Sequence, residues 1–351
     1  MDQTLKKIGK ALTKAVKSDR TYEEVTNIVS KIEPSASYMK GSLVRLAGLF
    51  IFVGDEKLFY FEKAEKRGSL TKLQKKLNGK CCPPPFYTVG EGFFTEKFYA
   101  AKNDKEFDEL IYSIFQPLSM ATIFNQMICS SNILSKHRSI IFETMEAYWF
   151  GMDYISTDSL VVVLEASLRD LIGEISGDRP SLKFKSHIRS LAIKRLDAVF
   201  HELKEIHWYP YKSSNFEHSL EHSGSDEELK FWVLLDHTMD AINAFLIWFN
   251  DVLYKEHKAD DGSFSLNRHN MLHGFSSRQA IPVYYPLIFW SLLSVYYIES
   301  LFLRPKTCFF PEADDKDREL SDYFGALVKD NGPAEGRRRM AKKFGVSYGR
   351  T

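Results

Sequence analysis

The clearest indication of the fold is the stretch from residue 138 to residue 176, RSIIFETMEAYWFGMDYISTDSLVVVLEASLRDLIGEIS. Apolar residues recur in it at three- and four-residue spacings, which is typical of helices that bury one face. The pattern predicts helices at 138–151 and 153–176, and similar patterns predict two more at 183–206 and 226–254. We therefore expect a mainly α protein built around a helical bundle.

A further apolar run, at 283–303, is long enough to raise the question of a membrane span. Ser291, Ser294 and Glu299 interrupt this run, and its tyrosines are scattered rather than confined to the two ends, where a bilayer meets water. We therefore predict a buried core helix and no membrane partner.

The first part of the chain has a different pattern. Residues 4–18 predict a short basic helix, and LFIFVGDEKLFYFE at 49–62 predicts a β-hairpin that turns at 54–57, with a continuous buried helix as the alternative. Three consecutive prolines predict a loop at 79–85, because proline lacks an amide donor. Helical spacing resumes at about residue 104.

Length and pattern together predict three parts. A chain of 351 residues exceeds the usual size of one core. We expect a smaller N-terminal α/β domain of unknown role at 1–135, a helical domain at 136–305 and a charged, basic C-terminal tail at 306–351.

Composition restricts the class of protein. Hydrophobic residues make up 44% of the chain, so it can bury a core, and 47 Lys and Arg nearly balance 46 Asp and Glu. A nucleic-acid role must therefore rest on local basic patches. The four cysteines are too few and too scattered for a disulfide framework and form no metal-binding pair; they are Cys81, Cys82, Cys129 and Cys308. With lysines interrupting the N-terminal apolar groups, this predicts a cytoplasmic protein.

Polar side chains are concentrated at 266–274, in the order Leu266-Asn267-Arg268-His269-Asn270-Met271-Leu272-His273-Gly274. Asn267 suits a helix N-cap and Gly274 a helix stop, so the segment predicts a short helix or helix edge. His269 and His273 are four residues apart and would share a face, whereas Arg268 must reach with its long side chain.

This segment resembles the motif of the HEPN superfamily of ribonucleases, in which an Arg precedes a polar residue and, a few positions on, a His. Arg268, His269 and His273 fill those positions here. The longer string at 267–274 is similar to that of abortive-infection-type members. Leu164-Glu165-Ala166-Ser167-Leu168-Arg169-Asp170, after Ala147-Tyr148-Trp149-Phe150-Gly151, resembles their "IEGLLRD" helix. The resemblance covers about 140–305.

The resemblance implies an HEPN-like bundle with endoribonuclease activity, acting as a toxin or abortive-infection, antiphage effector. It also implies a homodimer that forms the active centre between two protomers, with Glu165 and Arg169 supporting it. An antitoxin or other regulatory partner is a further expectation. No metal or other cofactor is expected.

The residue types suit RNA cleavage, because RNA carries its own nucleophile in the 2′-hydroxyl. We assign proton transfer to His273, since imidazole exchanges a proton near neutral pH. Arg268 would hold the phosphate oxygens as negative charge builds up. His269 is a candidate for the second proton carrier, and Asn267 and Asn270 for orienting an imidazole or holding a phosphate.

Other interpretations of the sequence stay open. The segment at 266–274 could belong to a catalytically inactive HEPN-like module that binds RNA or protein, or to helical scaffolding. His218 and His222 have the spacing of metal ligands on a helix but lie in a serine-rich connector. The basic residues near the C-terminus could raise RNA affinity through phosphate contacts; they are Arg337, Arg338, Arg339, Lys342 and Lys343.

Overall fold

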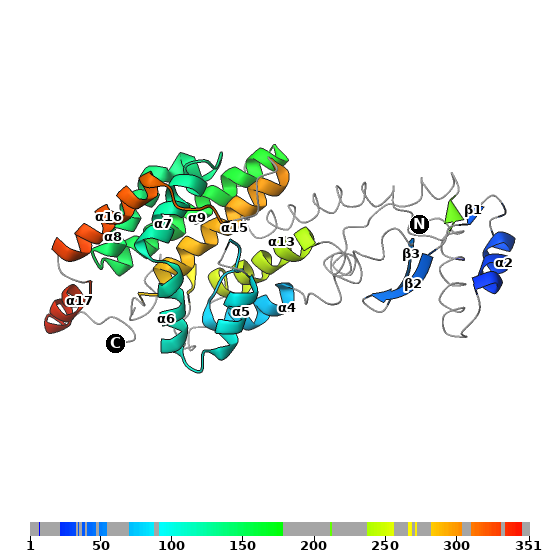
Figure 1. Ribbon diagram of the computed structural model, residues 1–351, viewed down its shortest axis with the longest axis horizontal. Helices are drawn as coiled ribbons and strands as arrows, with labels where there is room; N and C mark the ends of the chain where they lie inside the picture. Colours follow the sequence, from blue (N-terminus) through cyan, green and yellow to red (C-terminus); the bar gives the residue numbers. More distant parts are fainter. Residues whose placement is uncertain are drawn as a thin grey trace. The chain divides into compact units, whose positions relative to one another are not determined.

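The computed structural model describes two compact units, one made of residues 1–70 and 189–243 and the other of residues 71–188 and 244–351. The described residues are 7, 22–32, 34, 37–38, 41–46, 49–54, 70–87, 91–177, 211–212, 237–255, 266–268, 271, 282–303, 310–330 and 334–345. Helices dominate this part of the chain, as the sequence predicted (Figure 1).

The first unit contains α2 (Tyr22–Ile32), two short strand pairs and the start of α13. Strand β1 (Ser37–Tyr38) pairs antiparallel with β4 (Tyr211–Lys212), which joins segments far apart in the sequence. Strand β2 (Gly41–Leu46) pairs antiparallel with β3 (Leu49–Gly54), with Leu46 opposite Leu49.

The first strand of the predicted hairpin is therefore confirmed, and within the described part of the chain it pairs with β2. Residues 49–54 are extended, but the strand bonded to them precedes them in the chain. Two residues separate β2 from β3, the commonest length for a hairpin connection. The predicted partner at 58–62, the helical pattern at 183–206 and all of the predicted 4–18 helix except Lys7 lie outside the described residues.

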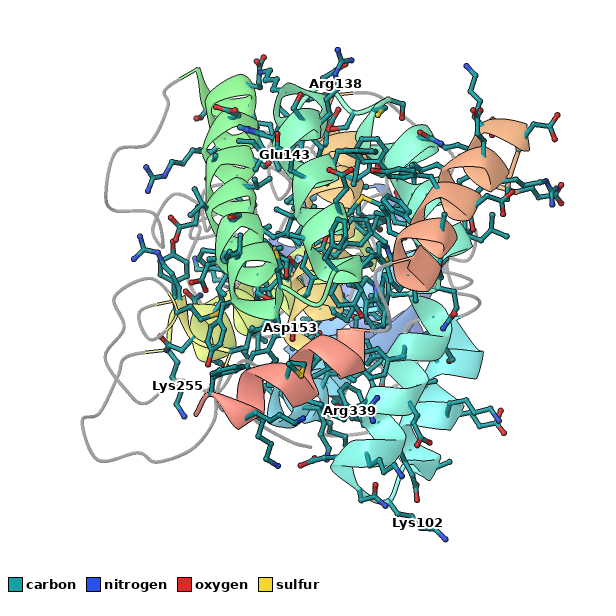
Figure 2. All side chains as sticks on the ribbon, turned by 90° about the vertical axis from the view of Figure 1, so that its left-hand side faces the viewer. Lys102, Arg138, Glu143, Asp153, Lys255 and Arg339 are labelled. Carbon is teal, nitrogen blue, oxygen red and sulfur yellow. The ribbon has the colours of Figure 1, made fainter. Side chains whose placement is uncertain are left out.

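The second unit is a helical bundle whose centre is α15 (Tyr284–Phe302). Helix α15 packs along α9 (Asp153–Ser176), and α8 (Arg138–Trp149) covers another side of α9. Figure 2 shows side chains filling the space between these helices, whereas Lys102 and Arg138 point outward. The bounds of α8 and α9 agree with the sequence prediction. Gly177 ends α9 with a φ of 82°, a left-handed conformation that glycine adopts without strain.

Helix α15 is the one described helix long and apolar enough to cross a membrane, and 89% of its apolar window is buried inside the protein. Two of its polar residues, Ser291 and Glu299, have hydrogen-bond partners there. The Ser291 hydroxyl donates to the carbonyl of Ile288 at 2.6 Å, and Glu299 accepts hydrogen bonds from the Ser131 hydroxyl and from the amide of Asn132 at 2.8 Å. The buried position that the sequence predicted is confirmed.

Shorter helices flank this bundle. They are α4 (Leu70–Leu77), η2 (Asn78–Lys80), α5 (Glu91–Ala100), α6 (Asp104–Ile114), α7 (Pro117–Thr122), the π-helix η3 (Ile123–Ile128) and η4 (Leu134–His137). The predicted proline loop follows η2 and is buried. Its carbonyl groups have donors: the indole of Trp248 donates to Cys81, and Gln74 donates to Cys82, at 3.1 and 2.8 Å.

The segment expected to be a polar tail is partly built into the bundle. Helix α16 (Asp315–Asp330) packs on α7 and α8, with Phe324 buried beside Trp149 and Phe142. Only a few residues of α16 are buried, and most of its residues are polar. The buried side of this helix is therefore hard to recognise from the sequence. Helix α17 (Ala334–Lys343) follows it.

Candidate functional site

The centre of the candidate site is the carboxylate of Glu165, on the helix that the sequence singled out. Glu165 is 7% exposed, and a buried charge is costly unless it is paired. Arg268 supplies the pair: its Nε donates to Oε1 of Glu165, and its Nη2 lies 3.4 Å from Oε2. Arg169, one turn along α9, has its Nη2 3.9 Å from Oε2. The structure thus brings together three predicted site residues.

A fourth participant, Tyr254, was not predicted. Its hydroxyl donates to the same Glu165 oxygen that receives Arg268 Nε. Its ring stacks on Phe249 at 4.4 Å between centroids, and the guanidinium carbon of Arg268 lies 5.4 Å from the ring centroid. A cation over an aromatic face is attracted by the ring's electron density, so Tyr254 contacts Arg268 through its ring and bonds to Glu165 through its hydroxyl.

Tyr254 reaches this position through an irregular helix end. Helix α13 (His237–Trp248) continues into the π-helix η5 (Phe249–Leu253), where the amide of Tyr254 bonds to the carbonyl of Phe249 at 2.8 Å. This bond spans five residues instead of four, which rotates the following side chain relative to a regular α-helix. The sequence does not reveal this π-helical turn, because the spacing of apolar residues continues unchanged through 249–253.

Burial raises the pKa of the Tyr254 hydroxyl above its ordinary value, and the hydrogen bond to Glu165 raises it further. The hydroxyl therefore stays protonated at neutral pH and acts as a donor to the carboxylate. Tyr254 is thus a fixed hydrogen-bond donor, and the arrangement gives it no role as a base.

The backbone beside Arg268 is held from both sides. Asn267 is buried, and its Nδ2 donates to the carbonyl of Lys255 at 2.5 Å, while the amide of Met271 donates to the Asn267 carbonyl at 3.0 Å. The second bond joins residues four apart, which is the hydrogen-bond spacing of an α-helix. The side-chain amide of Asn267 thus bonds to Lys255, the residue that follows Tyr254. In this position it supports the backbone near Arg268, whereas the sequence had suggested a role in orienting an imidazole or holding a phosphate.

The other predicted residues are less fully described. His269, Asn270 and His273 lie outside the described residues, as do His218 and His222. Arg337 and Arg338 belong to α17, but their side chains are not described. Arg339, Lys342 and Lys343 are exposed on that helix. Among the residues that the structure describes, no group of His, Cys, Asp or Glu could hold a metal ion.

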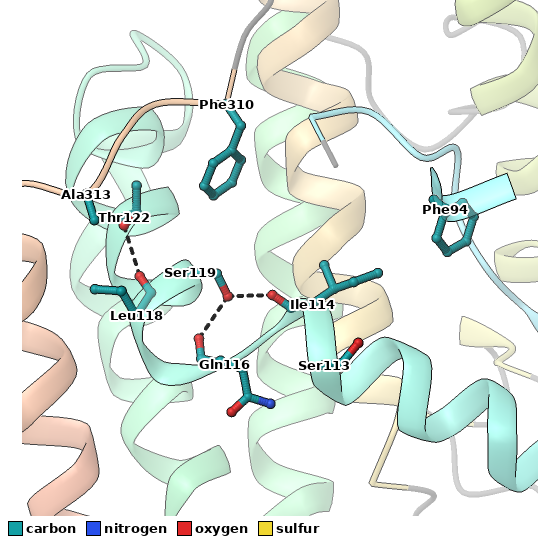
Figure 3. A pocket seen from close by; sticks show the side chains of 9 residues that line it. All are labelled: Phe94, Ser113, Ile114, Gln116, Leu118, Ser119, Thr122, Phe310 and Ala313. Carbon is teal, nitrogen blue, oxygen red and sulfur yellow. Dashed lines mark hydrogen bonds between the residues drawn. The ribbon is translucent and has the colours of Figure 1, made fainter. Parts of the chain in front are cut away.

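A cavity of about 480 Å³ lies elsewhere in the second unit, between α6, α7 and residues 310–313 (Figure 3). Phe94, Ile114 and Phe310 line it. The Ser119 hydroxyl donates to the carbonyl of Ile114 at 2.5 Å, and the Thr122 hydroxyl donates to the carbonyl of Leu118 at 2.9 Å. With its polar groups engaged in this way, the cavity has no feature of a catalytic centre.

No family model, curated protein or solved structure matches this chain.

Proposed function

We propose that this protein is a metal-independent RNA endonuclease of the HEPN type, with Arg268 and His273 as its catalytic residues. The observation that carries the proposal is the clamp on Arg268. Glu165, from the helix resembling "IEGLLRD", holds the arginine of the Arg-x4-His motif, and Tyr254 supports its guanidinium. The sequence had assigned Glu165 and Arg268 to the same function. These two residues are 103 positions apart in the chain, and they meet at this contact.

The clamp leaves Arg268 able to bind phosphate. A guanidinium has five N–H groups, and the contacts to Glu165 use its Nε and Nη2. Arg268 is 21% exposed at its side chain, so it is oriented without being sealed off. A positively charged group that is held in place stabilises charge in a transition state without reorganising at the moment of reaction.

In the proposed reaction His273 removes the proton from the 2′-hydroxyl, whose oxygen attacks the adjacent phosphorus. The bond to the 5′-oxygen breaks, and this leaving oxygen takes a proton from a second donor, His269 or a histidine of a partner subunit. Arg268 neutralises the charge on the non-bridging oxygens. The products are a cyclic 2′,3′-phosphate and a free 5′-hydroxyl.

We also propose that the protein acts as a homodimer and serves as a toxin or abortive-infection effector. Ile155 and Val162 support the dimer: they lie seven residues apart on one side of α9, and are 62% and 52% exposed. Exposed apolar residues on one helix face favour contact with another protein. The wider architecture in the proposal is an HEPN-like bundle with a smaller N-terminal α/β domain.

The second candidate is a catalytically inactive module that binds RNA or a partner protein. The observation in its favour is the same ion pair, because a guanidinium that neutralises a buried carboxylate can serve structure alone. Under this alternative, Glu165 and Arg268 fasten α9 to the turn at 266–268 and no proton transfer occurs.

A nuclease assay separates the two candidates. Purified protein is incubated with total RNA in the presence of a chelator, and we expect cleavage by the wild type and none by His273→Ala. We expect Arg268→Lys, which keeps the charge but loses the planar fork, to cut at least about tenfold more slowly. It is the better arginine variant, because Arg268→Ala leaves the Glu165 carboxylate buried without its cation.

The matched control is His222→Ala, a histidine of the connector that the proposed reaction does not use, and it should cut at the wild-type rate. RNA binding without cleavage by the wild type would favour the inactive module. Cleavage that disappears with the chelator would contradict the metal-independent mechanism.

A further inference from the structure

Helix α17 concentrates positive charge in the C-terminal part of the chain. Its sequence AEGRRRMAKK has five cations and one acid, while the whole chain has a net charge of +1. The rest of the chain is therefore net negative. A local basic surface on a neutral protein is the electrostatic arrangement that attracts a polyanion.

The cations of α17 that the structure describes are exposed and available. Arg339, Lys342 and Lys343 are all exposed, and in the described part of the chain they make no ion pair. Figure 2 labels Arg339 on this helix. Some cations elsewhere are paired: Lys136 pairs with Glu174 at 3.1 Å, and Lys80 pairs with Asp104 at 2.5 Å. Among the described residues, no ion pair therefore compensates the charge of these three cations.

Two large apolar side chains accompany these cations. Met340 is 53% exposed and Phe344, just past the helix end, is 80% exposed. They are four residues apart, so they project from neighbouring positions along one side of the helix. An aromatic ring beside several cations is the combination that proteins use to bind single-stranded nucleic acid, because bases stack on the ring while phosphates meet the charges.

We propose that α17 and Phe344 form a binding surface for single-stranded RNA, an inference that rests on the proposed RNA function. The cations contact successive phosphates and Phe344 stacks on an unpaired base. A membrane surface fits less well, because a helix that lies in a bilayer needs a broad apolar face, and α17 offers only Met340 and alanines before Phe344.

The test measures binding, independently of cleavage. A labelled, unstructured 2′-O-methyl RNA, which lacks the nucleophile for the proposed reaction, is titrated with the full chain across a salt series. Replacing Arg339, Lys342 and Lys343 together by Gln should weaken binding at least about tenfold and lower the slope of log affinity against log salt by about 2. Phe344→Ser should weaken binding by about tenfold and leave that slope unchanged.

The matched control replaces Lys97, Lys102 and Lys105 by Gln. These lysines are also exposed, and the change in net charge is the same. Lys105, for example, has Glu109 at 3.9 Å. We expect less than about a twofold loss of affinity. An equal loss in both triple variants would overturn the proposal, because total charge and not α17 would then govern binding.

Three further outcomes are informative. Co-sedimentation with phosphatidylserine vesicles, but no binding to the RNA, would overturn the proposal in favour of a membrane surface. RNA binding that depends on α17 in a protein that never cleaves RNA would support this inference while removing the nuclease. Cleavage that is lost in His273→Ala, combined with RNA binding unaffected in the α17 variants, would do the reverse.

Discussion

At the scale of single residues, the buried carboxylate of Glu165 is the feature on which the candidate site depends. It has a half-buried guanidinium and a tyrosine hydroxyl as donors. Removing one member of such a set leaves another polar group buried without its partner, which costs more than the interaction itself contributed. The energetic coupling between Glu165 and Arg268 can therefore be measured even before any activity is known.

We expect Glu165→Gln to lower the free energy of unfolding by about 2–4 kcal/mol, because it leaves Arg268 without its counter-charge. The double variant Glu165→Gln/Arg268→Met should lose clearly less than the sum of the two single variants. Urea denaturation of the four proteins gives the coupling. As a control, removing the exposed Lys105–Glu109 pair should change stability by less than about 0.5 kcal/mol. Strict additivity at Glu165 and Arg268 would rule out the clamp.

At the scale of helices, a buried aspartate fastens α16 to the bundle. Asp317 lies in the first turn of α16 and accepts hydrogen bonds from Asn125, at 2.9 Å, and Gln126, both on η3. Asp314 and Asp317 also exchange backbone-to-side-chain bonds at 3.0 and 2.9 Å. Burial alone would raise the pKa of Asp317, but the hydrogen bonds outweigh it and the pKa is lowered.

This lowered pKa predicts a pH dependence. A carboxyl group with a lower pKa in the folded than in the unfolded state stabilises the fold above its unfolded pKa, and the stabilisation is lost as pH falls through the folded pKa. Asp317→Asn should therefore be less stable than wild type at neutral pH and lose less stability on acidification. Urea denaturation over a pH series measures both effects.

The control is Asp315→Asn, two residues earlier in α16, where the side chain is fully exposed. It should follow the wild-type pH profile closely. If Asp317→Asn and Asp315→Asn had the same acid dependence, the network on η3 would not anchor α16.

At the scale of the whole molecule, we propose that the active centre draws on a second chain. One Arg-His pair supplies one proton carrier, whereas attack by the 2′-oxygen and departure of the 5′-oxygen each require a proton transfer. Ile155 and Val162 on the outer side of α9 lie on the same helix as Glu165, so a second copy docked there would approach this site.

We expect Val162→Glu to shift the protein from dimer to monomer in light scattering at micromolar concentration, because a charge would be buried at the contact. Met340→Glu on α17 is the matched control, since Met340 is 53% exposed and Val162 is 52% exposed. Mixed Arg268→Ala and His273→Ala chains should recover activity that each lacks alone. A wild-type monomer that cleaves RNA at full rate would contradict the shared centre.

Local periodicity determined the helices. The sequence predicted a helix at 153–176, and α9 has the same bounds; it predicted a core helix at 283–303, and α15 spans Tyr284–Phe302. Helical spacing and burial of one face are properties of neighbouring residues, so a short window of sequence contains them. The sequence also singled out Glu165, Arg169 and Arg268 as residues of one candidate site.

Tertiary structure decided which of these residues meet and what joins them. Tyr254 contacts a carboxylate 89 residues away through a π-helical turn that apolar spacing does not reveal. The packing of α16 on η3 through Asp317 likewise depends on segments distant in sequence. Local pattern sets which face of an element is apolar. Which other element packs against that face depends on the whole chain, because apolar surfaces are buried and charges are paired only when distant segments come together.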